Sequence, residues 1–197
     1  MKLIFATGNQ HKVEEIQSAI GEQLEIMSLQ QAHINIDIPE PHETLEENAS
    51  EKSRTIFTLT GLNCFSEDTG LEVEALHGAP GVRSARYAGD EKSFDKNIDK
   101  LLNELPRDSN RKAQFRTVIS LMLDGKEWLF EGVCRGQITA EKRGTGGFGY
   151  DPVFIPEGAQ KTFAEMSIEE KNYYSHRKKA ADQLIAFLKK NFPIIIQ

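Results

Sequence analysis

The chain has 197 residues and a formal net charge of −6, from 24 Lys and Arg against 30 Asp and Glu. Its 39% hydrophobic and 27% charged residues are ordinary for a globular protein, and no apolar stretch approaches the roughly 20 residues that a membrane-spanning helix needs. The acidic balance and the lack of a basic run argue against a protein that coats nucleic acid. Cys64 and Cys134 have neither metal-ligand spacing nor a disulfide framework, so we expect reduced core cysteines in a cytoplasmic protein.

The periodicity of apolar residues and the turn residues between them predict the secondary structure of most of the chain. The first half of the chain reads as a buried strand at 2–6, a helix at 12–20 ending at Gly21, and a helix from the capping box at 44–47 to Gly61. Short strands at 64–66 and 71–75 around a turn at 68–70 follow, and then an extended loop at 78–89. The second half reads as an amphipathic helix at 93–105, a long β-hairpin that turns at 124–125, and an amphipathic helix at about 175–190. Asp124-Gly125 between two alternating runs favours a type I′ turn. This order is not a regular βα repeat. It predicts an α/β fold in which a curved mixed sheet is flanked by helices, as one domain over residues 1–197 with two lobes and a central cleft.

Residues 144–149 read GTGGFG, which has the spacing of a dinucleotide-binding fingerprint. That fingerprint requires a helix directly after the glycines, so that the pyrophosphate lies at the helix N-terminus. Pro152 follows too soon for such a helix, and residues 153–155 read as a short strand closed by Pro156. We therefore exclude NAD and FAD. The glycines let the backbone approach a ligand closely, and Phe148 and Tyr150 offer flat faces for a heterocycle; the alternative is an ordinary glycine-rich surface turn.

ATGNQHK at residues 6–12 lies between the first strand and the first helix. A Gly/Asn turn at a helix N-terminus, followed by Lys12, suits an anion such as a phosphate. The alternative is that Thr7 or Asn9 only caps the helix.

Carboxylates gather at two places in the sequence. Glu67-Asp68 follows an apolar strand, and the ends of strands in α/β sheets are where ligands bind. A pair of this kind suits Mg²⁺, which takes a few carboxylates together with water and phosphate oxygens. A second group comprises Glu40, Glu43, Glu46 and Glu47, and for the glutamates in the helix a solvated face is the better explanation. Near the C-terminus, His176 and Arg177 are adjacent donors that could donate to a ring carbonyl and reject an amino group, although such a pair taken alone is more often surface decoration.

Five stretches together resemble the inosine triphosphate pyrophosphatase family, which degrades non-standard purine nucleoside triphosphates. They are ATGNQHK at 6–12, TLEENASEK at 44–52, SEDTGLEVEALHGAPGVRSARYAG at 66–89, GTGGFGYDPVF at 144–154 and EEKNYYSHRKKA at 169–180. The resemblance covers almost the whole chain. It implies Mg²⁺-dependent hydrolysis of ITP, dITP or XTP to the monophosphate and pyrophosphate by a homodimer, with a nucleoside triphosphate as the small-molecule partner and neither nucleic acid nor a membrane.

The resemblance also assigns residues to the site. Asp68 is the expected metal ligand and proton acceptor, Glu40 and Glu67 are further expected metal ligands, and the substrate is expected to contact Thr7, Gly8, Asn9, Gln10, His11, Lys12, Lys52, Thr69, Phe148, Gly149, Tyr150, Asp151, Lys171, His176 and Arg177. Lys12, Lys52 and Lys171 would supply charge to the phosphates, and His176 and Arg177 would read the 6-keto edge. The family usually has two adjacent aspartates where this chain has Glu67-Asp68, so Asp68 is the firmer of the two assignments. Two alternatives stay open: a pyrophosphatase for pyrimidine or methylated nucleotides, and a non-catalytic nucleotide- or RNA-binding module.

Overall fold

The computed structural model describes residues 2–192, and the chain divides into two compact units. Unit 1 consists of Met1–Asp68, Thr117–Gly132 and Arg177–Gln197, and unit 2 consists of Thr69–Arg116 and Val133–His176. The strands β3 (Cys64–Val73), β5 (Lys112–Leu123) and β6 (Lys126–Ile138) each contribute residues to both units. Because the units share these strands, each is built from discontinuous pieces of the chain.

One mixed sheet runs in the order β2-β1-β3-β5-β6-β7, and β4 pairs with β3. The strands not yet named are β1 (Lys2–Phe5), β2 (Glu25–Ser28), β4 (Pro80–Gly81) and β7 (Phe154–Pro156). β1 is parallel to β2 and β3, whereas the β3–β4 and β6–β7 pairs are antiparallel. The predicted α/β fold with a mixed sheet and flanking helices is therefore confirmed.

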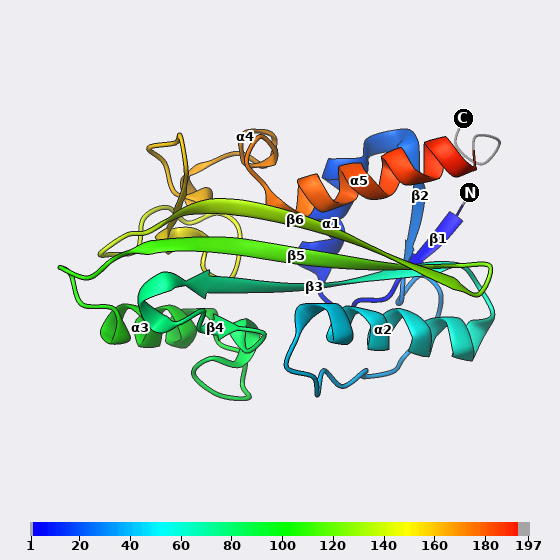
Figure 1. The fold of residues 1–197 in the computed structure, drawn as a ribbon, viewed down its shortest axis with the longest axis horizontal. Coiled ribbons are helices and arrows are strands. Elements are labelled where there is room, and N and C mark those ends of the chain that lie inside the picture. Colours follow the sequence, from blue (N-terminus) through cyan, green and yellow to red (C-terminus); the bar gives the residue numbers. More distant parts are fainter. Residues whose placement is uncertain (1, 193–197) are drawn as a thin grey trace. The chain divides into compact units, whose positions relative to one another are not determined.

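The sheet of unit 1 is covered on both faces by helices (Figure 1). Alternate residues of β1 point to opposite faces. Leu3 and Phe5 pack in a cluster with α1 (Gln10–Ile20) and α5 (His176–Asn191), while Ile4 packs with α2 (Leu45–Thr60) on the other face. The strand is buried on both faces, and this explains why residues 2–6 read as a continuous apolar run.

Unit 2 has its own hydrophobic cluster, formed by one face of its strands, α3 (Phe94–Glu104) and the segment around β7. Leu71 and Phe115 from the strands and Ile98 from the helix belong to this cluster. The short helix α4 (Ile168–Asn172) leads towards α5.

Local sequence signals set the helix ends correctly. Thr44 accepts a hydrogen bond from the backbone N–H of Glu47 at the start of α2, and Gly61 ends that helix with a positive φ of 68°. Both residues of the predicted hairpin turn have positive φ, 49° for Asp124 and 76° for Gly125, as a type I′ turn requires. No helix follows the glycines at 144–149; a three-residue 3-10 turn at Asp151–Val153 leads into β7, which agrees with the exclusion of a dinucleotide fingerprint.

The predicted turn at residues 68–70 is wrong, because β3 continues without a break from Cys64 to Val73. Asp68, Thr69 and Gly70 look like turn residues, but Glu67 and Asp68 are buried against cations, and Gly70 lies against the backbone of Gly81. The place of a β-carbon on Gly70 would be 2.6 Å from the Gly81 carbonyl oxygen, so the glycine permits a close approach of two strands. The predicted loop at 78–89 contains the short strand β4.

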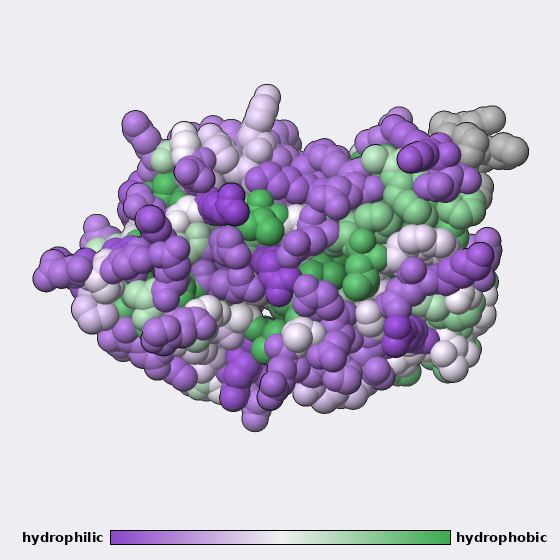
Figure 2. All heavy atoms as spheres, in the orientation of Figure 1, coloured by the Kyte–Doolittle hydropathy of each residue, from purple (hydrophilic) through white to green (hydrophobic). Residues whose placement is uncertain are grey.

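Hydrophilic residues cover most of the molecular face in Figure 2, and hydrophobic residues appear there in small groups. Within residues 2–192 the structure has no helix with the length and apolar composition needed to cross a membrane.

Candidate active site

The loop between β1 and α1 ends in a helix cap. The side-chain oxygen of Asn9 accepts hydrogen bonds from the backbone N–H groups of His11 at 3.0 Å and Lys12 at 3.3 Å. The backbone N–H of Asn9 donates to the Thr7 hydroxyl at 3.2 Å. Asn9 therefore caps the helix, and two of the backbone donors of this helix end are used by Asn9 itself.

Lys12 and Arg177 converge on a buried carboxylate in unit 1. The Arg177 guanidinium donates to both oxygens of Glu67, from Nε at 2.7 Å and from Nη2 at 2.8 Å, and its Nη1 donates to Glu15. The Lys12 ammonium lies 3.2 Å from Oε1 of Glu67. Arg177 is only 2% exposed and the Glu67 side chain 0%. The planar guanidinium can form such a two-point contact, which a lysine cannot.

These contacts fix the charge of Glu67. Burial alone would raise its pKa, but Arg177 and Lys12 outweigh burial and lower the pKa of Glu67 to about 2. The Arg177 pKa is raised by the same carboxylates against the effect of burial. Glu67 is thus ionised at every physiological pH, and its oxygens are occupied by cations.

A second cluster in unit 1 joins two carboxylates through one ammonium. Lys52 on α2 lies 2.5 Å from Oε1 of Glu40 and 3.3 Å from Oδ1 of Asp68. Burial lowers the Lys52 pKa, but Asp68 and Glu40 outweigh it and raise that pKa above its ordinary value. For Asp68 burial is the larger effect, so its pKa is raised although Lys52 and Lys12 oppose the shift. Asp68 is therefore the carboxylate of this site that binds a proton more readily than usual.

The two clusters are acidic as a whole. They contain three cations, Lys12, Lys52 and Arg177, and four carboxylates, Glu15, Glu40, Glu67 and Asp68. A polyphosphate would meet a negative site unless a further cation accompanied it. Among residues 2–192 the structure has no group of three or more His, Cys, Asp or Glu that could hold a metal by themselves. A metal at this site would therefore complete its shell with water or ligand oxygens.

The glycine-rich loop of unit 2 is fixed by a buried ion pair. Lys171 lies 2.5 Å from Oδ2 of Asp151, and the same oxygen accepts the backbone N–H of Phe148 at 2.9 Å. The Lys171 ammonium also lies 5.4 Å from the ring centre of Phe148 and 5.0 Å from that of Phe163. Gly147 is required here, because a β-carbon would come within 2.0 Å of Oδ2 of Asp151. Phe148 is half-buried.

His176 lies in an aromatic cluster behind this loop. Its ring stacks on Phe115, with centres 4.7 Å apart and planes 11° apart, and it is tilted towards Phe163 at 6.4 Å. The neighbouring side chains His176 and Arg177 thus have different surroundings: aromatic rings for the first and carboxylates for the second.

The predicted residues are divided between the two units. The contacts described above join Lys12 and Arg177 to Glu67, Glu40 and Asp68 to Lys52, and Phe148 and Lys171 to Asp151. Unit 1 holds Thr7–Lys12, Glu40, Lys52, Glu67, Asp68 and Arg177, and unit 2 holds Thr69, Phe148–Asp151, Lys171 and His176. Tyr150 belongs to the hydrophobic core, where its hydroxyl donates to the carbonyl of Ser84 at 2.9 Å, so its ring is not an outward flat face. Lys171 binds a carboxylate in the loop, where the sequence had suggested a phosphate contact.

Two residues that contact predicted site residues were missed by the sequence analysis. Glu15 binds Arg177, and it lies three residues after Lys12, on the same side of α1. That spacing was visible in the sequence. Phe115 behind His176 had no such signal, because its place depends on the pairing of distant segments.

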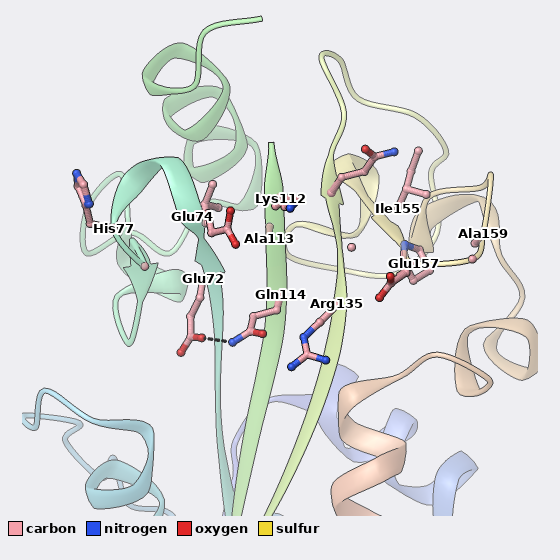
Figure 3. Close-up of a pocket in the computed structure, with 16 residues that line it drawn as sticks. Glu72, Glu74, His77, Lys112, Ala113, Gln114, Arg135, Ile155, Glu157 and Ala159 are labelled. Atoms are coloured by element: carbon pink, nitrogen blue, oxygen red, sulfur yellow. Dashed lines mark hydrogen bonds between the residues drawn. The ribbon is translucent and has the colours of Figure 1, made fainter. Parts of the chain in front are cut away.

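A cavity of about 810 Å³ lies elsewhere in unit 2 (Figure 3). Polar side chains of three strands line it, among them Glu72, Gln114 and Arg135. None of the predicted site residues is among those that line this cavity.

Comparisons with known proteins identify the family of the chain. A family model described as the Ham1 family matches residues 3–187. A protein of Flavobacterium johnsoniae named dITP/XTP pyrophosphatase is 51% identical over 188 residues, which cover 95% of this chain and 98% of that protein. A Porphyromonas gingivalis protein with the same name is 52% identical over 188 residues and 95% and 97% of the two chains. The structure of the Staphylococcus aureus Ham1 protein superposes with a TM-score of 0.86 at 38% identity, over 96% of this chain and 99% of that one.

Proposed function

Because the chain belongs to the Ham1 family over residues 3–187, we propose that it is a dITP/XTP pyrophosphatase, which hydrolyses dITP, ITP and XTP to the monophosphate and pyrophosphate. The observation that carries this assignment within the molecule is the pair of Asp68, which is buried, and Glu40, which is half-buried, on the buried Lys52 ammonium. A carboxylate with a raised pKa next to lysines is suited to take a proton from water beside a phosphate.

The residues present fit Mg²⁺. Asp68 and Glu40 both lie against one ammonium, so their oxygens already converge on a single positive centre. Mg²⁺ characteristically uses one or two carboxylates together with waters and substrate phosphates. Asp68 and Glu40 would hold the metal, which would offset phosphate charge and polarise the α-phosphorus. The contacts of Glu67 with Arg177 and Lys12 support another role for it, that of orienting the Lys12 ammonium.

The chain's own residues divide the reaction between them. Asp68 accepts a proton as a water oxygen attacks the α-phosphorus, and the bond from that phosphorus to the bridging oxygen breaks, so that pyrophosphate leaves. Lys12 and Lys52 stabilise the charge that develops on the leaving oxygen. The segment Thr7–Lys12 binds phosphate oxygens through whichever backbone donors the Asn9 cap leaves available.

We assign the purine to the unit 2 residues. The Phe148 ring stacks on the base, and Gly149 and Thr69 contribute close contacts. Asp151 with Lys171 holds Phe148 in place. His176 supplies a donor to the 6-keto edge. Arg177 supports the neighbouring carboxylates, since its guanidinium is engaged by Glu67 and Glu15.

Pyrophosphate release tests this function most directly. We would measure it from ITP, XTP, GTP, ATP and dTTP, each with Mg²⁺ and with EDTA. We expect fast release from ITP and XTP only, abolished by EDTA. Turnover of dTTP would instead favour a pyrimidine-directed enzyme, and nucleotide binding that is indifferent to Mg²⁺ and without turnover would favour a binding module.

Asp68→Asn tests the proton acceptor. We expect kcat for ITP to fall by roughly 10²–10⁴-fold with the fold intact, because the amide cannot accept the proton. Glu43→Gln is the matched control, because Glu43 is an exposed carboxylate in the same acidic segment as Glu40. A near-normal rate for Asp68→Asn would remove this residue from its assigned role.

We also propose that the enzyme is a cytoplasmic homodimer, as its family resemblance implies. The sheet face around the cavity of unit 2 is a candidate for a contact between two copies, since Lys112 and Arg135 lie there among Glu72, Glu74 and Glu157 (Figure 3). In a two-fold contact the cations of one copy can pair with the carboxylates of the other. Sedimentation should give a dimer that Arg135→Glu weakens, and a monomer at high concentration would exclude the assembly.

A further inference from the structure

We propose that Phe94, the first residue of α3, is a positioning residue that holds Phe148 in the orientation in which it receives the purine. This inference rests on the proposed function, because it concerns the ring to which we assign the base. It makes the first turn of α3 part of the base site, although no motif in the sequence marks it.

Phe94 touches Phe148 directly. The two ring centres are 6.1 Å apart, within the distance range of favourable aromatic pairs, and the planes are tilted by 49°. Phe94 is 41% exposed and lies outside the hydrophobic clusters of the protein's described part. Its ring is thus placed against the loop at the surface, where its contribution to core burial is small.

A second tether joins the same turn of α3 to the start of the loop. The Lys142 ammonium lies 2.9 Å from a carboxylate oxygen of Asp95 and 2.8 Å from one of Asp99. Lys142 comes two residues before Gly144, the first glycine of the loop. Helix α3 therefore holds the loop on both sides of Gly144, Gly146 and Gly147.

This tethering matters because of the glycines. Glycine has more accessible backbone conformations than any other residue, so a loop with four of them is ordered only where other groups hold it. Phe148 is fixed at its backbone by Asp151, and its ring has Phe94 and the Lys171 ammonium as neighbours. Removing Phe94 takes away a ring contact while the backbone anchor stays.

Loss of the Phe94 contact should weaken the binding of ligands that contain a base and leave the binding of pyrophosphate unchanged. If Phe148 samples several orientations in the free protein, a ligand that stacks on it must select one of them, and its apparent affinity falls by the fraction of molecules in that orientation. Pyrophosphate has no base and would not experience this loss. A general loss of structure would weaken both ligands alike.

The test compares these two ligands in Phe94→Ala by calorimetric titration of IMP and of pyrophosphate, both with Mg²⁺. From the usual strength of an aromatic pair we expect IMP to bind about threefold to tenfold more weakly and pyrophosphate to stay within about twofold. Phe94→Tyr should restore IMP binding, because it keeps the ring. Asn103→Ala, at an exposed position of the same helix, should change neither. Equal changes in IMP and pyrophosphate, or no change in IMP, would overturn the proposal.

Amide hydrogen exchange separates this inference from the proposed function. Peptides that cover residues 144–151 should exchange several-fold faster in Phe94→Ala than in the wild type, and Lys142→Gln should add to the effect. That readout needs no nucleotide, so it stands even if the wild type releases no pyrophosphate from ITP. Unchanged exchange in both variants would refute the tether, whatever the enzyme hydrolyses.

Discussion

Replacing Arg177 by Met should destabilise the protein strongly. The guanidinium makes two hydrogen bonds to Glu67 and a third to Glu15, and all three side chains are buried. Removing one partner of a buried ionic network leaves charges that water cannot reach, and this typically costs about 3–5 kcal/mol. We therefore expect the free energy of unfolding of Arg177→Met at pH 7 to fall by about that amount.

The pKa of Glu67 gives a second order-of-magnitude value for the stability that the same ion-pair network supplies. A carboxyl whose pKa falls from its ordinary 4.5 to about 2 on folding stabilises the folded state by about 3 kcal/mol at neutral pH. Because the folded pKa is depressed, this contribution is present above the ordinary pKa and is lost as the pH falls from about 4.5 towards 2. The wild type should thus lose this stability over that window, whereas Glu67→Gln should not show this part of the slope.

A double-mutant cycle with urea unfolding combines these expectations. The losses of unfolding free energy caused by Arg177→Met and by Glu67→Gln should not be additive at pH 7, because each change removes the same interaction. The loss in the double variant should be about 2–3 kcal/mol smaller than the sum of the two single losses. At pH 2 the coupling should shrink. Lys178→Met is a matched control, since that lysine pairs with Asp182 along the exposed face of the same helix. Additive losses at pH 7, or a coupling that does not change with pH, would refute the buried ion pair as the source of this stability.

Three further predictions concern individual residues. Gly147→Ala should destabilise the protein by about 2–4 kcal/mol, because residue 147 has a φ of +69° and the new β-carbon would meet Asp151. Gly149 has a φ of +61° but open space around it, so Gly149→Ala should destabilise the protein by only about 1–2 kcal/mol. Thermal unfolding of the two variants would measure the difference. Lys171→Met should lower the free energy of unfolding by about 3 kcal/mol, because it leaves the buried Asp151 carboxylate without its ammonium partner. Adding Asp151→Asn should recover part of this loss, and a double variant with no recovery would contradict a stabilising ion pair between the two residues. Burial raises the pKa of the Cys64 thiol to about 12, so iodoacetamide at pH 8 should label Cys64 in urea but not in the native protein, as mass spectrometry would show.

Much of the fold could be predicted because its signals are local. Helix α2 begins after Thr44 and ends at Gly61, as the capping rules predict, and Asp124-Gly125 forms the hairpin turn with the expected positive φ angles. The same local rules failed at residues 68–70. There the turn-forming residues remain in a strand, because buried cations and a neighbouring strand stabilise the extended chain.

The candidate site was predictable to the level of residue types. The carboxylates, lysines and glycine-rich loop were visible as motifs, and their family resemblance indicated nucleotide chemistry. Their partners were not visible. Arg177 contacts a glutamate that is 110 residues away in the sequence, and no periodicity links residues at such a separation.

The sequence by itself determined the elements of this protein and the chemical groups it can use, because hydrophobic period, caps and turns act between residues a few positions apart. Only the tertiary structure decided which cationic side chain pairs with which carboxylate. It directed Arg177 to Glu67, Lys52 to Asp68 and Lys171 to Asp151, and it set the pKa of Asp68 in the opposite direction from that of Glu67. The physical reason is that burial and pairing depend on distances of a few ångströms, and these distances exist only after remote segments have packed together.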